Sequence, residues 1–112
     1  MLYVTDEREV AESPKEQGAN ENRAYSFDFT AAGVTTIEGT PTIAIYDWTT
    51  SPPTDVSATK LSAGTPTASG LVVTTVKQVQ ALTDGIEYRL YCRVAHDGGQ
   101  DSELYCRIFG RA

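Results

Sequence analysis

The sequence predicts an all-β sandwich, and three observations indicate this class. Residues 86–94 place their side chains alternately on two faces, with the apolar ones on one of them, which is typical of a strand with one buried face. The alternation returns over residues 103–108 after a stretch that contains two glycines, so the two segments form a long hairpin. Further short segments rich in β-branched and aromatic residues are separated by turn residues, and none of them has a convincing helical period. We therefore expect about seven antiparallel strands.

Length and composition limit the classes of protein to consider. A chain of 112 residues forms one domain and can bury a core without a disulfide or a metal. Its net charge of −6 argues against nucleic acid as a partner, because phosphates require a basic surface. No apolar run is long enough to span a membrane, and the first residues lack the basic and apolar regions of a signal peptide. We therefore expect an intracellular product that needs no cofactor.

Residues 1–23 form an acidic N-terminal arm, and residues 24–112 form the sandwich domain. The arm is polar, and Pro14 and Gly18 limit any helix in it to about one turn. Residues 1–40 carry eight acidic and three basic side chains, so most of the negative charge is near this end. We expect the arm to be either flexible or placed along a sheet edge.

The first strands of the domain are marked by apolar side chains at alternate positions. Residues 24–30 form a strand that points Tyr25, Phe27 and Phe29 toward the core. Residues 42–48 form the next strand, with two isoleucines on its inner face, and Ile37 is a single inward residue before it. The three aromatic side chains in register are expected to anchor the core.

The middle of the chain is rich in Thr, Ser, Pro and Gly. Residues 56–61 fit a short strand within it, and residues 64–66 and 69–70 have the composition of turns. Residues 71–79 are rich in valine and threonine and predict a longer strand.

The register of the last hairpin is open between two alternatives. If the chain turns about Gly98, Tyr91 faces Tyr105, and Cys106 lies opposite Leu90. If it turns about Gly99, Tyr91 faces Arg107, and the two cysteines lie opposite each other within reach of a disulfide. An intracellular location favours reduced thiols.

The segment that leads into this hairpin resembles a known structural motif. Leu82, Gly85 and Tyr88 resemble the tyrosine corner of immunoglobulin-like and fibronectin type III domains. The resemblance implies that the Tyr88 ring packs inward while its hydroxyl bonds a backbone group at the corner. The Cys–Trp–Cys pattern of antibody domains is absent, because both cysteines lie in the last hairpin. We therefore expect an immunoglobulin-like sandwich, but not an antibody-type one.

A narrower resemblance covers residues 13–109. Residues 14–15, 23–29, 36–37 and 88–94 look like the corresponding segments of small immunoglobulin-like bacteriophage virion proteins, the head–tail or fibre–tail adaptors. This resemblance implies a non-enzymatic structural component that docks other phage proteins, without a small-molecule substrate. It also implies a location in the virion after synthesis in the bacterial cytoplasm.

Residues with catalytic or metal-binding chemistry are few. His96 is the only histidine, and we expect it to be solvated at the hairpin tip without a nucleophile and an orienting acid beside it. A zinc site from Cys92, His96 and Cys106 is disfavoured, because residues four apart on a strand are about 13 Å apart. Acidic side chains at the hairpin tip have calcium-binding chemistry but lack EF-hand spacing; they are Asp97, Asp101 and Glu103.

The outward face of the last hairpin is the candidate binding surface. It is rich in tyrosine and arginine, which are enriched at protein interfaces, and it consists of Arg89, Tyr91, Arg93, Tyr105, Arg107 and Phe109. The alternative is a normal solvated sheet exterior. A second hypothesis for the function is a glycan- or cell-surface-binding module, for which the candidate aromatic residues are Tyr46, Trp48, Tyr91 and Tyr105.

Overall fold

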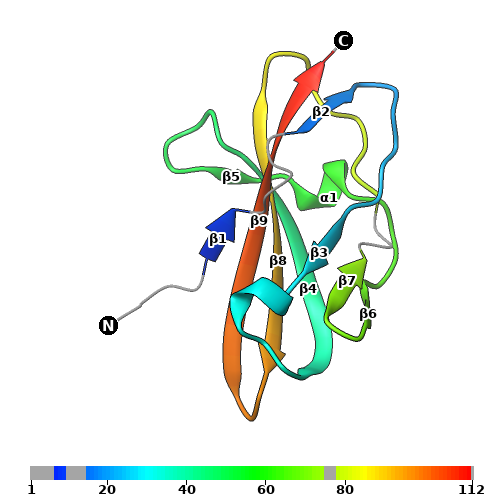
Figure 1. The fold of residues 1–112 in the computed structure, drawn as a ribbon. Helices are drawn as coiled ribbons and strands as arrows, with labels where there is room; N and C mark the ends of the chain where they lie inside the picture. The colour runs from blue at the N-terminus through cyan, green and yellow to red at the C-terminus, as the bar shows by residue number, and fades with distance from the viewer. Residues whose placement is uncertain (1–6, 10–14, 75–77, 112) are drawn as a thin grey trace.

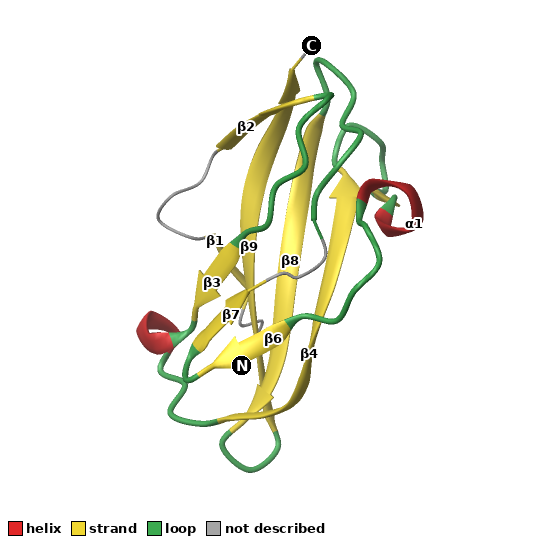
Figure 2. Cartoon of the chain, turned by 90° about the vertical axis from the view of Figure 1, so that its right-hand side faces the viewer, coloured by secondary structure: helices red, strands yellow, loops and turns green. Residues whose placement is uncertain are grey.

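The chain forms an all-β sandwich of two sheets, as the sequence predicts (Figures 1 and 2). This computed structural model describes residues 7–9, 15–74 and 78–111. The larger sheet is ordered β1 (Glu7–Glu9), β9 (Gln100–Arg111), β8 (Glu87–His96), β4 (Ile37–Asp47) and β5 (Thr54–Asp55), and β2 (Lys15–Gly18) also pairs with β9. The smaller sheet is ordered β3 (Ser26–Asp28), β7 (Val72–Thr74) and β6 (Thr67–Ser69).

The core lies between the two sheets. Figure 2 shows the smaller sheet in front of the larger one. Phe27 and Val73 from the smaller sheet join Ile45 and Leu90 from the larger one in a single buried apolar cluster. Phe29 belongs to the same cluster, which confirms the inner face expected for residues 24–30, although the strand itself is shorter.

The hairpin of β8 and β9 adopts the register that turns about Gly98. Tyr91 lies opposite Tyr105, and Leu90 lies opposite Cys106. Gly98 and Gly99 have φ of 80° and 110°, a backbone region in which glycine is favoured. Both cysteines are therefore free thiols in this structure, and each is buried in the core.

Strand β4 is longer than the expected segment 42–48. It begins at Ile37, whose side chain packs against the core as expected. The pairing with β8 shifts its register between Glu38 and Thr42, where a glycine and a proline interrupt the regular pattern. The irregularity allows the chain to continue as one strand past residues that the sequence indicates as breakers.

Residues 56–61 do not form a strand, so that prediction was wrong. They contain helix α1 (Ser57–Lys60), and residues 30–32 form a 3-10 helix, η1 (Thr30–Ala32). The Asp55 carboxylate accepts a hydrogen bond from the Ser57 N–H at 2.9 Å, and the Lys60 N–H donates to the Val56 carbonyl at 3.0 Å. These local bonds favour a turn over the β-propensity of Val56. Within the described residues, neither helix has the length and apolarity to cross a membrane.

The segment expected as a strand over residues 71–79 is only partly a strand. Strand β7 pairs with β6 in a hairpin about Gly70, one of the expected turns. Residues 75–77 lie outside the described residues. Val79 then makes isolated bridges with Arg23 and Leu61.

The described part of the N-terminal arm lies along a sheet edge, which is one of its two expected arrangements. Strands β1 and β2 both run parallel to β9 (Figure 1). Residues 1–6 and 10–14 lie outside the described residues.

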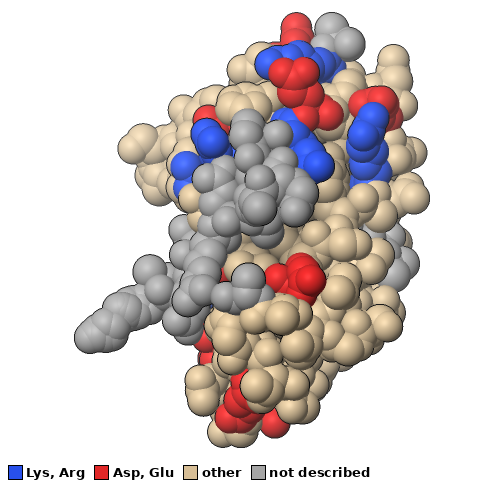
Figure 3. All heavy atoms as spheres, viewed as in Figure 1, with Lys and Arg blue, Asp and Glu red and all other residues tan. Residues whose placement is uncertain are grey.

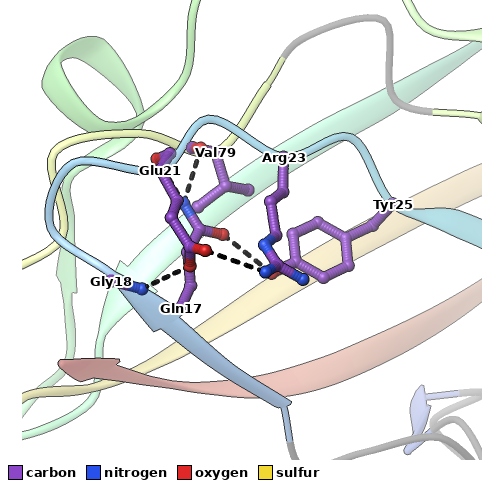
Figure 4. A network of polar contacts seen from close by, with 6 residues as sticks. All are labelled: Gln17, Gly18, Glu21, Arg23, Tyr25 and Val79. Atoms are coloured by element: carbon purple, nitrogen blue, oxygen red, sulfur yellow. Dashed lines mark hydrogen bonds and ion pairs between the residues drawn. The ribbon is translucent and has the colours of Figure 1, made fainter.

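A network of hydrogen bonds connects residues 17–25 to residue 79 (Figure 4). Gln17 is 1% exposed, and its Nε2 donates to the carbonyls of Val79 at 2.7 Å and Glu21 at 2.9 Å. The Tyr25 hydroxyl donates to the Gln17 Oε1 at 2.7 Å, and burial raises the pKa of Tyr25 to about 12. A buried amide with its groups paired in this way stabilises one arrangement of the segment.

The loop before β8 makes the backbone bond that the tyrosine corner implies. The Tyr88 hydroxyl accepts a hydrogen bond from the Thr83 N–H at 3.0 Å, while the Tyr88 ring is 2% exposed. The Gly85 N–H donates to the Gly110 carbonyl at 3.0 Å, and Gly110 lies against the Thr83 backbone. The corner is therefore held to the last residues of β9.

Candidate functional site

A group of aromatic rings and one arginine lies on the outer face of the larger sheet. We call it the aromatic–arginine cluster; it consists of Tyr46, Trp48, Arg89, Tyr91 and Tyr105. Even-numbered side chains of β8 face the core, so its odd-numbered ones project from the opposite face. The cluster lies where β4, β8 and β9 run side by side (Figure 1).

Tyr91 is the centre of the cluster. Its ring centroid lies 5.7 Å from that of Tyr46 in an edge-to-face arrangement, 5.3 Å from that of Tyr105 and 6.1 Å from that of Trp48. These separations are within the range of favourable aromatic pairs. Tyr91 is only 6% exposed, so it does not fit the alternative of a normal solvated sheet exterior. It lies on the outer face, but its neighbours cover it.

Arg89 is stacked against two of these rings. Its Cζ lies 4.1 Å from the Trp48 ring centroid and 4.9 Å from that of Tyr105. The buried Nε of Arg89 has no hydrogen-bond partner among the described residues, and the nearest carboxylate oxygen, from Glu87, is 3.8 Å away. Arg107 lies directly opposite on β9. The two ring contacts therefore hold the Arg89 guanidinium in a fixed position.

A hollow of about 260 Å³ opens beside the cluster. Tyr46, Trp48, Tyr91, Pro53 and Glu103 line it. Three aromatic rings, a proline and one carboxylate form a shallow surface of mixed polarity with a single anionic group. Such a composition is typical of sites that bind a small ring-shaped or apolar group.

The structure brings together half of the interface residues expected from the sequence. Arg89, Tyr91 and Tyr105 belong to the cluster, and Arg107 borders it. Arg93 lies farther along β8 and forms an ion pair with Asp101 at 3.4 Å. Phe109 is at the other end of β9, with the Arg111 guanidinium 5.8 Å from its ring centroid.

Cation–aromatic contacts form in this register, although it places no aromatic ring directly opposite Arg89 on β9. In this register Arg89 faces Arg107, and it reaches Tyr105 along the diagonal between the strands. Trp48 supplies the second ring from the far side of β8. Trp48 and Tyr46 were expected only for the glycan hypothesis, and a one-strand pattern could not place them beside Arg89. Pro53 was not expected at all.

His96 is not a solvated loop residue, so that prediction was wrong. It is 4% exposed at the end of β8, and both of its ring nitrogens have partners. Its Nδ1 lies 2.7 Å from the Asp97 carboxylate, and its Nε2 lies 2.8 Å from the Ser102 hydroxyl. Asp97 also accepts hydrogen bonds from the backbone N–H of Thr35, at 3.0 Å, and from the Thr35 hydroxyl.

These contacts place Ser102, His96 and Asp97 in the order of a nucleophile, a base and an orienting acid. The sequence predicts no such set, because Ser102 lies six residues after His96 and belongs to no recognised motif. Ser102 and His96 are both buried, whereas a catalytic serine must be reached by its substrate. Hydrogen bonds connect the tip of the β8–β9 hairpin to Thr35, in the loop before β4, and to Glu38. Acidic side chains gather at this end of the molecule, at the bottom of Figure 3.

The residues considered for metals are engaged elsewhere. Burial raises the pKa of Cys92 to about 12, which disfavours the thiolate that zinc requires. Hydrogen bonds from Thr35 and His96 lower the pKa of Asp97, and Asp101 pairs with an arginine. The described residues contain no cluster of three His, Cys, Asp or Glu side chains placed to hold a metal ion.

A scan against family models, a search of curated proteins and a search of solved structures each found no match for this chain.

Proposed function

We propose that the chain is a non-enzymatic structural component of a phage or prophage particle. In this proposal an immunoglobulin-like sandwich docks other virion proteins through the outer face of β4, β8 and β9. The protein is synthesised in the bacterial cytoplasm and is retained in the virion. The resemblance described above supports the phage context, and the hydrogen bond between Tyr88 and Thr83 supports the immunoglobulin-like assignment.

The aromatic–arginine cluster is the observation that carries the docking proposal. Trp48, Arg89 and Tyr105 are packed against each other but remain partly exposed on a face that the smaller sheet does not cover. Pre-packed tyrosine, tryptophan and arginine side chains lose little conformational freedom on binding, and they are the residue types that dominate protein interfaces. The face is therefore suited to a protein partner that buries these three side chains.

Particle composition tests this proposal. Mass spectrometry of particles from a host that carries the gene should detect the chain at a fixed ratio to other virion proteins. Tyr105→Ser should reduce its incorporation at least tenfold, because it removes a ring that contacts Arg89 and Tyr91. Thr67→Arg on exposed β6 is the control and should be incorporated normally. A gene outside any phage or prophage cluster, or normal incorporation of Tyr105→Ser, would contradict the proposal.

The hollow favours a second candidate function, a glycan-binding module. Its three aromatic rings and the Glu103 carboxylate offer flat faces to the C–H groups of a sugar and an acceptor to its hydroxyls. Binding of oligosaccharides to the purified chain on a glycan array tests this function. An absence of binding across the array would eliminate it and leave the docking proposal intact.

The non-enzymatic part of the proposal has its own test. The set of Ser102, His96 and Asp97 is the arrangement most similar to an acyl-transfer site among the described residues. We expect no turnover of p-nitrophenyl esters above the background rate of a Ser102→Ala variant. Turnover that is lost in both Ser102→Ala and His96→Ala would overturn this expectation.

A further inference from the structure

A second hollow, which we call the basic hollow, lies between the two sheets and is separate from the docking face. It has a volume of about 390 Å³, and the lining residues that matter here are Lys15, Arg23, Ala24, Tyr25, Phe27 and Cys106. Lys15 and Cys106 belong to β2 and β9 of the larger sheet, whereas residues 23–27 lead into β3 of the smaller one. Cys106 faces the core, so the basic hollow is on the side of β9 opposite to the aromatic–arginine cluster.

Both charged side chains that line the basic hollow are cationic. Lys15 and Gln17 are two residues apart on β2, so they share the side of the strand on which Gln17 is buried. Lys15 is half-buried and forms no ion pair with a carboxylate of the described residues. An ammonium group that is partly desolvated and lacks a counter-charge is stabilised by an anion beside it.

Arg23 supplies the second cation, and Glu21 occupies only part of its guanidinium. The Nη2 of Arg23 contacts the Glu21 carboxylate at 2.9 Å, and Glu21 is not among the residues that line the basic hollow. The two side chains are 53% and 46% exposed, so solvent weakens this ion pair. A guanidinium has five N–H donors, so donors remain for a ligand.

The rest of the lining offers apolar surface and no negative charge. Phe27 and Cys106 are buried members of the core. The Tyr25 hydroxyl donates to Gln17, so Tyr25 offers the hollow its ring. Burial raises the pKa of Tyr25 to about 12, so this ring stays neutral at physiological pH. The basic hollow therefore combines aromatic surface with two cations from separate segments.

Two cations on separate segments suit a phosphate better than a carboxylate. A carboxylate has two oxygens in one plane, and a single guanidinium can satisfy both. A phosphate monoester has three terminal oxygens and a charge of about −1.5 to −2 at pH 7, so it can contact an ammonium and a guanidinium together. A volume of about 390 Å³ leaves space beside the phosphate for a ring-sized apolar group.

We propose that the basic hollow binds a small phosphate monoester, with the phosphate between Lys15 and Arg23 and the organic group against Tyr25 and Phe27. The net charge of −6 does not prevent this binding, because charges more than about 8 Å away are largely screened at physiological salt. Two cations can hold one phosphate group but not a nucleic-acid backbone. This inference is independent of the docking proposal.

Backbone amide shifts in nitrogen–proton correlation spectra of the full chain provide the assay. Phenyl phosphate, benzoate and benzyl alcohol share a ring and differ in the attached group, and inorganic phosphate lacks the ring. We expect saturable shifts at residues 15–17, 23–27 and 105–107 with phenyl phosphate, and at least fivefold weaker binding of the other three. Binding of phenyl phosphate should also weaken when salt is raised from 20 to 200 mM.

Variants separate the two cations from a general effect of charge. Lys15→Gln and Arg23→Gln should each weaken binding of phenyl phosphate at least fivefold and leave binding of benzyl alcohol unchanged. Ala24→Glu places a carboxylate at an exposed lining position and should weaken phenyl phosphate at least tenfold. Arg93→Gln removes an exposed arginine that pairs with Asp101 outside the basic hollow, and it should bind within twofold of the wild type. If Lys15→Gln fails to fold, the exposed positions 23 and 24 decide.

Each contrary result overturns a definite part of the inference. Equal binding of the three ring compounds would overturn the preference for phosphate, and equal binding of inorganic phosphate would overturn the contribution of the aromatic rings. Equal losses in Arg23→Gln and Arg93→Gln would overturn the role of Arg23, because net charge would then explain the effect. Shifts confined to the aromatic–arginine cluster, or no saturable shift with phenyl phosphate, would overturn the site itself.

Discussion

A single methyl group added at Gly110 should strongly destabilise the corner before β8. A Cβ atom added to Gly110 would lie 2.1 Å from the Thr83 carbonyl oxygen and 2.9 Å from its carbonyl carbon. Real Cβ atoms essentially never approach another heavy atom closer than 3.0 Å, so the Thr83 backbone would have to move by about 0.9 Å. Backbone cannot rotate away from the contact as the end of a flexible side chain can.

The expected loss follows from what that movement disrupts. Gly110 exchanges backbone hydrogen bonds with Gly85 at 3.0 Å and with Ile86 at 2.9 Å. Each such bond contributes about 1 kcal/mol, and overpacking a well-filled site costs about 1–3 kcal/mol. We therefore expect Gly110→Ala to lower the free energy of unfolding by roughly 3–5 kcal/mol.

Urea unfolding, followed by fluorescence and circular dichroism, measures this loss. With a slope of about 2 kcal/mol per M, the midpoint should fall by roughly 1.5–2.5 M. Gly18→Ala is the matched control, because its added methyl would meet only the Glu21 side chain at 3.5 Å. The control should change stability by no more than about 1 kcal/mol in either direction. Equal effects of the two substitutions would refute the close approach of Gly110 to Thr83.

Four other perturbations have definite expected outcomes. Tyr88→Phe leaves the Thr83 N–H without its acceptor and should cost about 1 kcal/mol in urea unfolding; no loss would contradict the corner hydrogen bond. Leu90→Ala opens a cavity at a fully buried site and should cost roughly 2–5 kcal/mol, whereas a loss below that of Tyr88→Phe would mean that Leu90 is not in the core. The Cys92 thiol, whose pKa burial raises to about 12, should react with Ellman's reagent only after unfolding, and rapid reaction in the folded chain would contradict its burial. Hydrogen bonds from Thr35 and His96 hold the pKa of Asp97 below its usual value, so its contribution to stability is present above about pH 4 and is lost as the pH falls further; Asp97→Asn should therefore be less stable than wild type at pH 7, with a difference that shrinks toward pH 2, and a constant difference would refute this coupling.

The parts of the fold that follow from local pattern were predictable from the sequence. Alternation over β8 and β9 correctly places Leu90, Val94, Leu104 and Ile108 in the core, because a strand with one buried face has a strict period of two. The same pattern could not choose between two turn positions one residue apart. The structure selects the turn about Gly98.

The parts that depend on contacts between distant segments were not predictable. Gln17 lies in an acidic, polar segment that the sequence predicts as an arm. It is nevertheless buried by contacts with Tyr25 and Val79. His96 directly precedes a turn that the sequence suggests is exposed, yet Ser102 and Asp97 satisfy its ring nitrogens and allow its burial. A polar residue can be buried wherever partners are supplied, and a linear pattern does not identify partners in other segments.

The candidate site illustrates the same limit on one surface. The outward Tyr and Arg positions of the hairpin were visible from the alternation. The addition of Trp48 from beyond the end of β4, and of Pro53 from the loop that follows, required the sheet order. A period of two assigns side chains to a face, but it does not say which strands are neighbours on that face.

The most direct test of the docking face is oxidative footprinting of the chain, free and assembled in purified particles. Trp48 and Tyr105 should be oxidised at least fivefold more slowly in the particle than in the free chain, while the exposed residues of β6 should keep their rate. Unchanged oxidation of Trp48 and Tyr105, with protection at β6 instead, would contradict the assignment of the outer face of β4, β8 and β9 as the interface.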